Sequence, residues 1–184
     1  MMKNTLNRNI LLFLLIVFTT SLSCQDKDKE AIKTVVENLL KAHTESDYDT
    51  WIKYWANQPY VFLSHTNNEG QILWYGRENL QKMAKVGFQS SIEAQKKYEF
   101  TLTLEGKDYF IRVYSESAWA QFKINWIYKN NKGETYESES FENYVFEKEN
   151  GDWKVATINA VGVSTFKEQD TEEEKVAVDS LSNQ

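Results

Sequence analysis

Glu142 is the residue best suited to chemistry, because it lies on an aromatic and hydroxyl-bearing face of a predicted strand. Side chains over residues 136–148 alternate, and the face with Glu142 also carries Tyr136, Ser138, Ser140, Tyr144 and Phe146. A few polar groups among large rings are typical of a ligand-pocket wall. A carboxyl buried there has a raised pKa and can act as an acid or a base. The alternative is a structural ion pair with Lys123 or Lys154 of a neighbouring strand.

The chain has two histidines, His43 and His65. His65 ends a predicted strand, where an imidazole that titrates near neutrality could serve as a general base at a pocket rim; alternatively it is a loop histidine. His43 lies near the end of the first predicted helix, where a cation offsets the helix dipole, so we expect it to be structural or exposed. No histidine or cysteine pattern has metal-ligand spacing, so we predict no metal and no cofactor.

Several aromatic and polar side chains accompany Glu142 on neighbouring predicted strands. Trp126 shares a face with Phe122, and Trp74 ends a hairpin strand. Such rings stack on a flat or apolar ligand, or they form the core. Thr157 and Asn159 follow Trp153 and Val155 at alternate positions of the last strand. The pocket is therefore predicted to be lined by Trp74, Trp126, Glu142, Tyr144, Thr157 and Asn159.

Three helices are predicted to position these strands. Residues 30–43 carry apolar side chains at helical spacing, namely Ile32, Val35, Val36, Leu39 and Leu40. Ser46 and Asp49 resemble a capping box for a second helix, which ends before Pro59. Gly76 opens a third helix whose inward side chains are predicted to be Leu80, Met83, Ala84 and Phe88.

The remaining segments have the period of strands. Residues 60–65 and 71–75 predict a hairpin, and longer alternating stretches follow at 98–104, 109–114, 118–129, 136–148 and 153–163. Short turns between them require antiparallel pairing. Several of these strands exceed the usual length. Long strands bend, and a bent sheet has a concave face that helices can close.

The first residues read as an export signal. Lys3 and Arg8 precede the apolar run at 10–18, which is half the length of a spanning helix, and small polar residues follow. Ser21-Leu22-Ser23-Cys24 resembles a bacterial lipobox, and this resemblance implies acylation of Cys24. We expect a signal peptide at 1–23, a lipidated cysteine and tether at 24–29, the domain at 30–166 and an acidic disordered tail at 167–184. The alternative is an ordinary cleaved signal with a stray thiol.

Charge excludes some partners. The chain carries a net charge of −6, and residues 1–23 contain two bases and no acid, which leaves −8 on the remainder. A segment this acidic has no basic surface for nucleic acid, and it does not adhere to anionic lipid by charge. We expect an exported protein of the cell envelope whose contact with the membrane is the lipid anchor, in the outer membrane, facing the periplasm or the surface.

The order of helices and strands resembles the nuclear-transport-factor-2-like superfamily, within it the SnoaL-like group. The local likeness is carried by residues 142–148 leading through Gly151 into Trp153-Lys154-Val155, by Ala118-Trp119-Ala120, and by Asp49-x-Trp51. The resemblance spans about residues 30–166. It implies an α+β fold in which three N-terminal helices pack on a strongly curved, mostly antiparallel β-sheet, a cone with a pocket between the layers.

This resemblance leaves several functions open, because the superfamily contains isomerases, dehydratases, cyclases, non-catalytic subunits and transport adaptors. The family often has a histidine where Thr157 or Asn159 stands, and its absence argues against catalysis. We therefore expect a non-catalytic domain that binds a small apolar or aromatic molecule. One alternative is an isomerase-, dehydratase- or cyclase-type enzyme that uses Glu142 or His65 for proton transfer. Another is an interaction module that forms a homodimer through the outer face of the sheet.

Overall fold

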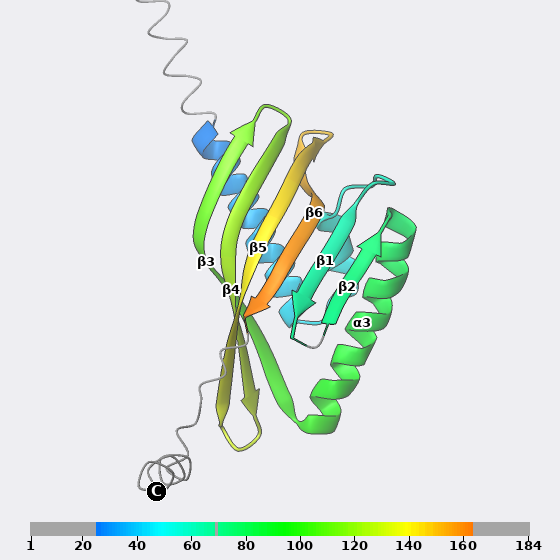
Figure 1. Cartoon of the computed structure of the whole chain (residues 1–184), viewed down its shortest axis with the longest axis vertical. Helices are drawn as coiled ribbons and strands as arrows, with labels where there is room; N and C mark the ends of the chain where they lie inside the picture. The colour runs from blue at the N-terminus through cyan, green and yellow to red at the C-terminus, as the bar shows by residue number, and fades with distance from the viewer. Residues whose placement is uncertain (1–24, 69, 164–184) are drawn as a thin grey trace, which may run out of the picture.

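A computed structural model describes residues 25–68 and 70–163. The predicted signal peptide, Cys24 and the predicted acidic tail lie outside the described residues. Among the residues that are described, no helix has both the length and the apolar character needed to cross a bilayer. Figure 1 shows the described part as helices packed against one sheet.

The N-terminal helix covers residues 25–44. Its predicted apolar stripe is buried, and Ile32 and Val36 are fully enclosed. The helix also includes the charged segment 25–29, which was predicted as a tether. Asp28 explains this difference, because it accepts a hydrogen bond from Trp153 Nε1 (3.0 Å) and pairs with Lys148 Nζ (3.2 Å). These contacts attach this part of the helix to the end of the sheet where Lys148 and Trp153 flank a turn.

A short second helix and one 3₁₀ turn follow, α2 (Tyr48–Trp51) and η1 (Ile52–Tyr54). The predicted capping box from Ser46 is wrong. Asp47 caps α2 instead, with its carboxylate accepting from the Thr50 amide (2.9 Å). Ser46 has a φ of 55°, because it forms the left-handed turn that reverses the chain between the two helices.

The third helix, α3 (Arg77–Tyr98), begins directly after Gly76 as predicted. Leu80, Ala84 and Phe88 are buried at helical spacing. Met83 was also expected to face inward, but it is 37% exposed. It lies one position before Ala84 and so turns about 100° away from the buried stripe.

In the part of the chain that the structure describes, six strands form one sheet in the order β2-β1-β6-β5-β4-β3. Their bounds are β1 Phe62–Asn67, β2 Gly70–Tyr75, β3 Phe100–Tyr114, β4 Ser117–Asn130, β5 Thr135–Glu149 and β6 Asp152–Val163. Neighbours pair antiparallel, as the short turns require, except β1 and β6, which pair parallel. This parallel pair joins the β1–β2 hairpin to β6, which is the last strand in the sequence and lies inside the sheet.

Two irregularities interrupt the long strands. The predicted turn at 105–108 is a register shift within β3, between Lys107 and Phe110, so the two expected strands are one. In β6 the partners of Val145 and Phe146 are Thr157 and Val155, and Ala156 lies between them as an extra residue. Such bulges bend a strand and change the face to which the following side chains point.

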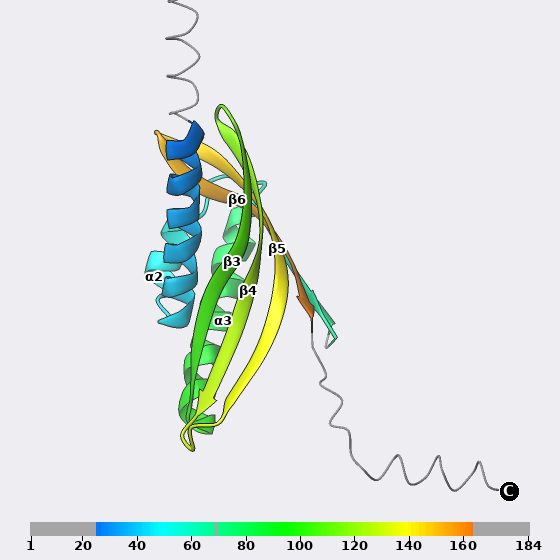
Figure 2. The same ribbon diagram turned by 90° about the vertical axis from the view of Figure 1, so that its left-hand side faces the viewer.

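The helices cover one face of the curved sheet, as Figures 1 and 2 show. The sheet bends around the N-terminal helix and α3, and the main hydrophobic core lies between the two layers. The α+β architecture predicted from the sequence, with helices on a strongly curved and mostly antiparallel sheet, is confirmed.

Candidate functional site

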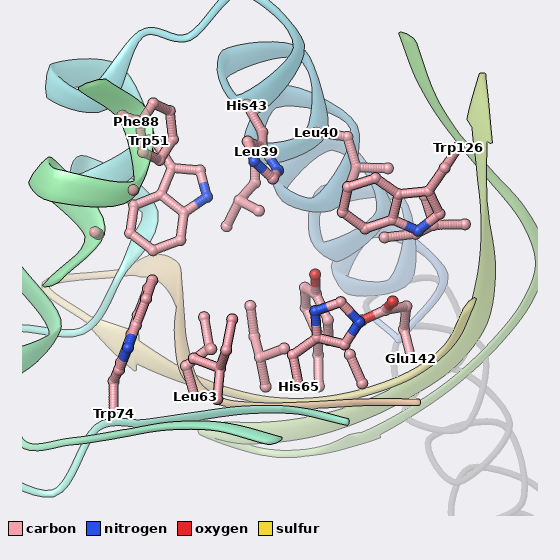
Figure 3. A pocket seen from close by; sticks show the side chains of 17 residues that line it. Leu39, Leu40, His43, Trp51, Leu63, His65, Trp74, Phe88, Trp126 and Glu142 are labelled. Atoms are coloured by element: carbon pink, nitrogen blue, oxygen red, sulfur yellow. The ribbon is translucent and has the colours of Figure 1, made fainter. Parts of the chain in front are cut away.

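A cavity of about 220 Å³ lies between the helices and the concave face of the sheet. The N-terminal helix, the α2 helix and α3 form one side, and the sheet forms the other, with side chains from both layers pointing into the space (Figure 3). Apolar and aromatic side chains dominate the lining. Its polar side chains are Glu142, His43, His65 and Tyr144, together with the indole nitrogens of Trp51, Trp74 and Trp126.

Glu142 is placed in the middle of the sheet by β5, between Phe122 of β4 and Ala160 of β6. Its side chain faces the helices and is 2% exposed. Ser140, two residues earlier on the same face, donates a hydrogen bond to Glu142 Oε1 (2.5 Å). The Ser140 hydroxyl in turn accepts from Trp126 Nε1 (2.8 Å). The predicted face of residues 136–148 therefore carries a short hydrogen-bond chain from an indole through a hydroxyl to a carboxyl.

Burial raises the pKa of Glu142 to about 7, and the hydrogen bond from Ser140 opposes this rise. The predicted ion pair with a lysine is wrong. Lys123 lies on the outer face and pairs with Glu139 (3.4 Å), while Lys154 donates to the Lys53 carbonyl (3.1 Å). Without a nearby cation, Glu142 exchanges its proton close to neutral pH.

His65 of β1 lines the same cavity, stacked against Trp126 with 6.2 Å between ring centroids. Burial lowers the pKa of His65 from its usual value. At neutral pH its imidazole is therefore uncharged, with one nitrogen that donates and one that accepts. Figure 3 shows this ring on the floor of the cavity, on the same side as Glu142.

His43 also lines the cavity, which corrects the expectation that it is structural or exposed. It meets Phe88 at 5.3 Å and Trp126 edge-on at 5.8 Å. Burial, and then repulsion from His65, lower the pKa of His43 to about 4. The sequence spacing predicts this burial, because His43 follows Leu39 and Leu40 by four and three residues and so continues the buried stripe of the helix.

Tyr144 is the fourth polar group, two residues after Glu142 on the inward face of β5. Its ring packs edge-on against Phe122 at 4.8 Å. Burial, followed by the charge of Glu142, raises the pKa of Tyr144 well above its usual value, so the phenol keeps its proton. It is thus a hydrogen-bonding group that does not change charge near neutral pH.

The ring surfaces of the cavity come from both layers. Trp74 and Trp126, predicted from the sequence, line it from the sheet. Trp51 and Phe88 line it from the helices and pack against each other at 5.5 Å. The sequence identified these two as helix-face residues but gave no signal that they border a cavity rather than fill the core.

Thr157 and Asn159 do not line the cavity, in contrast to the prediction. Ala156 is the cause, because the bulge there ends the alternation begun by Trp153 and Val155. After the bulge, Ile158 and Ala160 face the cavity. Strand β6 therefore adds only apolar side chains to the site, and no ionisable group.

The chemistry available to this site is hydrogen bonding and proton exchange. It combines a carboxyl that titrates near pH 7, two uncharged imidazoles and a phenol in apolar surroundings. Within the described ranges, no group of three or more His, Cys, Asp or Glu side chains is arranged to hold a metal ion.

Comparison with solved structures gives many proteins of the same fold. An NTF2-like protein from Streptomyces avermitilis, for which a dehydratase activity has been suggested, superposes with a TM-score of 0.61, at 16% identity over 76% of this chain and 99% of that chain. An NTF2-like superfamily protein from Salmonella enterica gives 0.58, at 17% identity over 79% and 97% of the chains. An NTF2-like protein with a cystatin-like fold from Novosphingobium aromaticivorans gives 0.58, at 12% identity over 90% and 94%.

No family model matches the chain, and no curated protein matches it. At identities this low the superpositions establish the fold alone. The chain has the NTF2-like, cystatin-like fold, as its resemblance to that superfamily implied. This fold hosts both binding domains and enzymes, so the function must be argued from the cavity itself.

Proposed function

We propose that this domain binds a small, mostly apolar molecule in the cavity between its helices and its sheet. The observation that supports this most is the lining of the cavity, where aromatic and aliphatic side chains surround a single buried carboxyl. Ligand sites typically combine such an apolar wall with a few placed polar groups. The molecule lies against Trp74 and Trp126 and hydrogen-bonds at the end formed by Glu142 and His65.

The size of the cavity limits the ligand. An engineered apolar cavity of about 150 Å³ is known to hold benzene. The present cavity, at about 220 Å³, is larger by roughly one short substituent. We therefore expect a single ring, or an aliphatic chain of similar bulk, carrying one polar group.

Native mass spectrometry of the protein from its source cell tests this proposal, followed by thermal-shift assays with small aromatic compounds. A bound molecule or a stabilising ligand is expected, and Ala160→Leu, which places extra atoms in the cavity, should abolish binding. The matched control is Val161→Leu, since Val161 is the next residue on β6 and is 51% exposed. If no compound binds, or if both variants affect binding equally, the proposal fails.

A proton-transfer enzyme is the second candidate. It is supported by the carboxyl of Glu142, with its pKa of about 7, and by the unprotonated imidazole of His65 in the same cavity. A catalytic acid or base works best when its pKa lies near the working pH. The ligand recovered from the protein would then exchange a carbon-bound hydrogen in D₂O, as measured by mass spectrometry. Glu142→Gln should stop this exchange even at ligand concentrations that saturate the variant; exchange at the same rate would exclude a role for Glu142.

We further propose that the chain is exported and anchored in the cell envelope through an acylated Cys24. This is supported by the basic start, the short apolar run and the small residues before Cys24. We also propose a homodimer through the outer face of the sheet. Phe141 and Val161 support it, because they are paired neighbours on β5 and β6 and are 41% and 51% exposed.

A further inference from the structure

The cavity lining has an acidic side chain but no lysine or arginine to balance its charge. Of the 17 residues that line it, Glu142 is the only acid, and none is Lys or Arg. His43 and His65 are the remaining side chains that could carry a positive charge, and burial holds the pKa of each below its usual value. As the pH rises above 7 the lining therefore gains one charge, that of ionised Glu142, and that charge is negative.

The carboxyl of Glu142 is also incompletely paired. Among the residues that the structure describes, its one hydrogen bond comes from Ser140 to Oε1, and its other oxygen receives none. No cation of the described chain lies within ion-pair distance of it. A buried carboxylate without a counter-charge is costly, and a group that supplies the opposite charge recovers part of that cost.

The surroundings of the carboxyl suit a cation. The indole of Trp126 is connected to this carboxyl by hydrogen bonds through the Ser140 hydroxyl. Trp51, Trp74 and Phe88 also line the cavity with aromatic rings. Aromatic faces attract cations, most strongly where water is excluded. The neutral imidazole of His65 offers one acceptor nitrogen, and the Tyr144 hydroxyl can also accept, so an N–H donor finds several acceptors at this end.

We infer that the cavity takes a ligand that joins a small aromatic or apolar body to a positively charged amino group, with the amino group on Glu142. This inference rests on the proposed binding function and names its ligand class. A ligand with a carboxylate or phosphate is rejected, because its charge would lie beside that of Glu142. A neutral ligand of the same shape fills the cavity without gaining the ion pair.

The inference sets the pH dependence of binding. An ammonium ligand needs ionised Glu142, so affinity rises as pH increases through the pKa of about 7. Between pH 5.5 and 8 the ionised fraction, and hence the affinity, grows about 30-fold. The titratable groups that line the cavity with Glu142 are His43, His65 and Tyr144, and Tyr109 acts on Tyr144 through its charge. Burial lowers the pKa of His65, and it lowers the pKa of His43 to about 4, so neither imidazole gains positive charge as the pH rises. Burial raises the pKa of both phenols, which keep their protons throughout.

Three probes of matched size test the inference: 2-phenylethylamine, 2-phenylethanol and phenylacetate, each titrated calorimetrically into the full chain at pH 8. The amine should bind at least tenfold more tightly than the alcohol, and phenylacetate should not bind. Glu142→Gln should reduce the affinity of the amine to that of the alcohol and leave the alcohol unchanged. Glu137→Gln, an exposed carboxyl on the opposite face of β5, is the control and should change neither.

The outcomes separate this inference from the binding proposal. If the alcohol or phenylacetate binds as tightly as the amine, the cation preference is overturned and the binding function remains. If none of the three binds and no molecule is recovered from the source cell, both are overturned. The pH series on the unaltered chain needs no variant, and an amine affinity that stays constant or falls from pH 5.5 to 8 overturns the inference by itself.

Discussion

Glu142 and His43 make the stability of the folded state depend on pH in opposite directions. Burial raises the pKa of Glu142 to about 7, so this carboxyl lowers stability as pH rises from about 4.5 to 7, where the unfolded chain loses the proton first. Burial lowers the pKa of His43 to about 4, so stability is lost as pH falls from 6.5 to 4, where the unfolded chain gains the proton first. Between about pH 4.5 and 6.5 these two contributions to the pH dependence of stability have opposite signs and largely cancel.

We predict that single substitutions expose the two opposing slopes. Glu142→Gln should raise the free energy of unfolding at pH 8 by up to roughly 3 kcal/mol and give almost no gain near pH 4. His43→Gln should show the reverse, with its largest gain near pH 4. Denaturant titrations at pH 4, 6 and 8 measure both. A gain for Glu142→Gln that is the same at every pH would contradict the assigned cause.

At the scale of the elements, Asp28 attaches the start of the N-terminal helix to the sheet. Asp28→Ala removes its bond from Trp153 and its pair with Lys148, and both partners are mostly buried. We expect the free energy of unfolding to fall by about 1–3 kcal/mol, because the indole N–H loses its acceptor. Asp26→Ala is the control, since Asp26 is 75% exposed and its one ion pair among the described residues is with Lys29 at the surface. Equal effects in chemical denaturation would show that the contacts of Asp28 add nothing.

The elements themselves could be predicted, and so could the inward face of β5. The period of two over 136–148 identified Ser140, Glu142 and Tyr144 as one face, and all three are buried. The bulge at Ala156 could not be predicted, because alanine at this position carries no turn signal and the shift depends on pairing with β5. That single unseen residue moved Thr157 and Asn159 out of the predicted site.

The cavity depends on how helices and sheet come together, which no local pattern reports. His43 was interpreted from its place near a helix end, although its spacing from Leu39 and Leu40 predicts burial. The tether at 25–29 was interpreted from its charges, and the contacts of Asp28 that fold it into the helix join residues more than 100 positions apart. Long-range contacts of this kind decide where a domain begins.

For the whole molecule, the first question is its oligomeric state. We expect light scattering to show a dimer at micromolar concentration. Val161→Glu, which places a charge beside Phe141 on the outer face, should shift the protein to monomers without changing its cavity. Val86→Glu is the control, because Val86 is an apolar residue of α3 with a similar exposed fraction of 57%. A monomer at all concentrations, or a shift with both variants, would contradict a dimer through the sheet.

The second question for the whole molecule is its location. We expect Cys24→Ala to move the protein from the membrane fraction to the soluble fraction, because a multiply acylated cysteine is held by the burial of its chains. Mass spectrometry of the unaltered protein should show a mature chain that begins at an acylated Cys24. A mature chain with a free thiol at this position would contradict the anchor.

Residues 25–29, the segment predicted as a tether, belong to the helix, so the proposed anchor at Cys24 would be followed directly by folded structure. The helix includes residue 25, the first that the structure describes, and its cavity-lining residues are Leu39, Leu40 and His43, near its C-terminal end. At 1.5 Å per residue, His43 lies about 27 Å along the axis from residue 25. If this helix stood perpendicular to the membrane, it would hold the binding site away from the headgroups by nearly the thickness of a bilayer's hydrocarbon core. Ligands would then arrive through water, and dissolved amines would reach the site before membrane lipids.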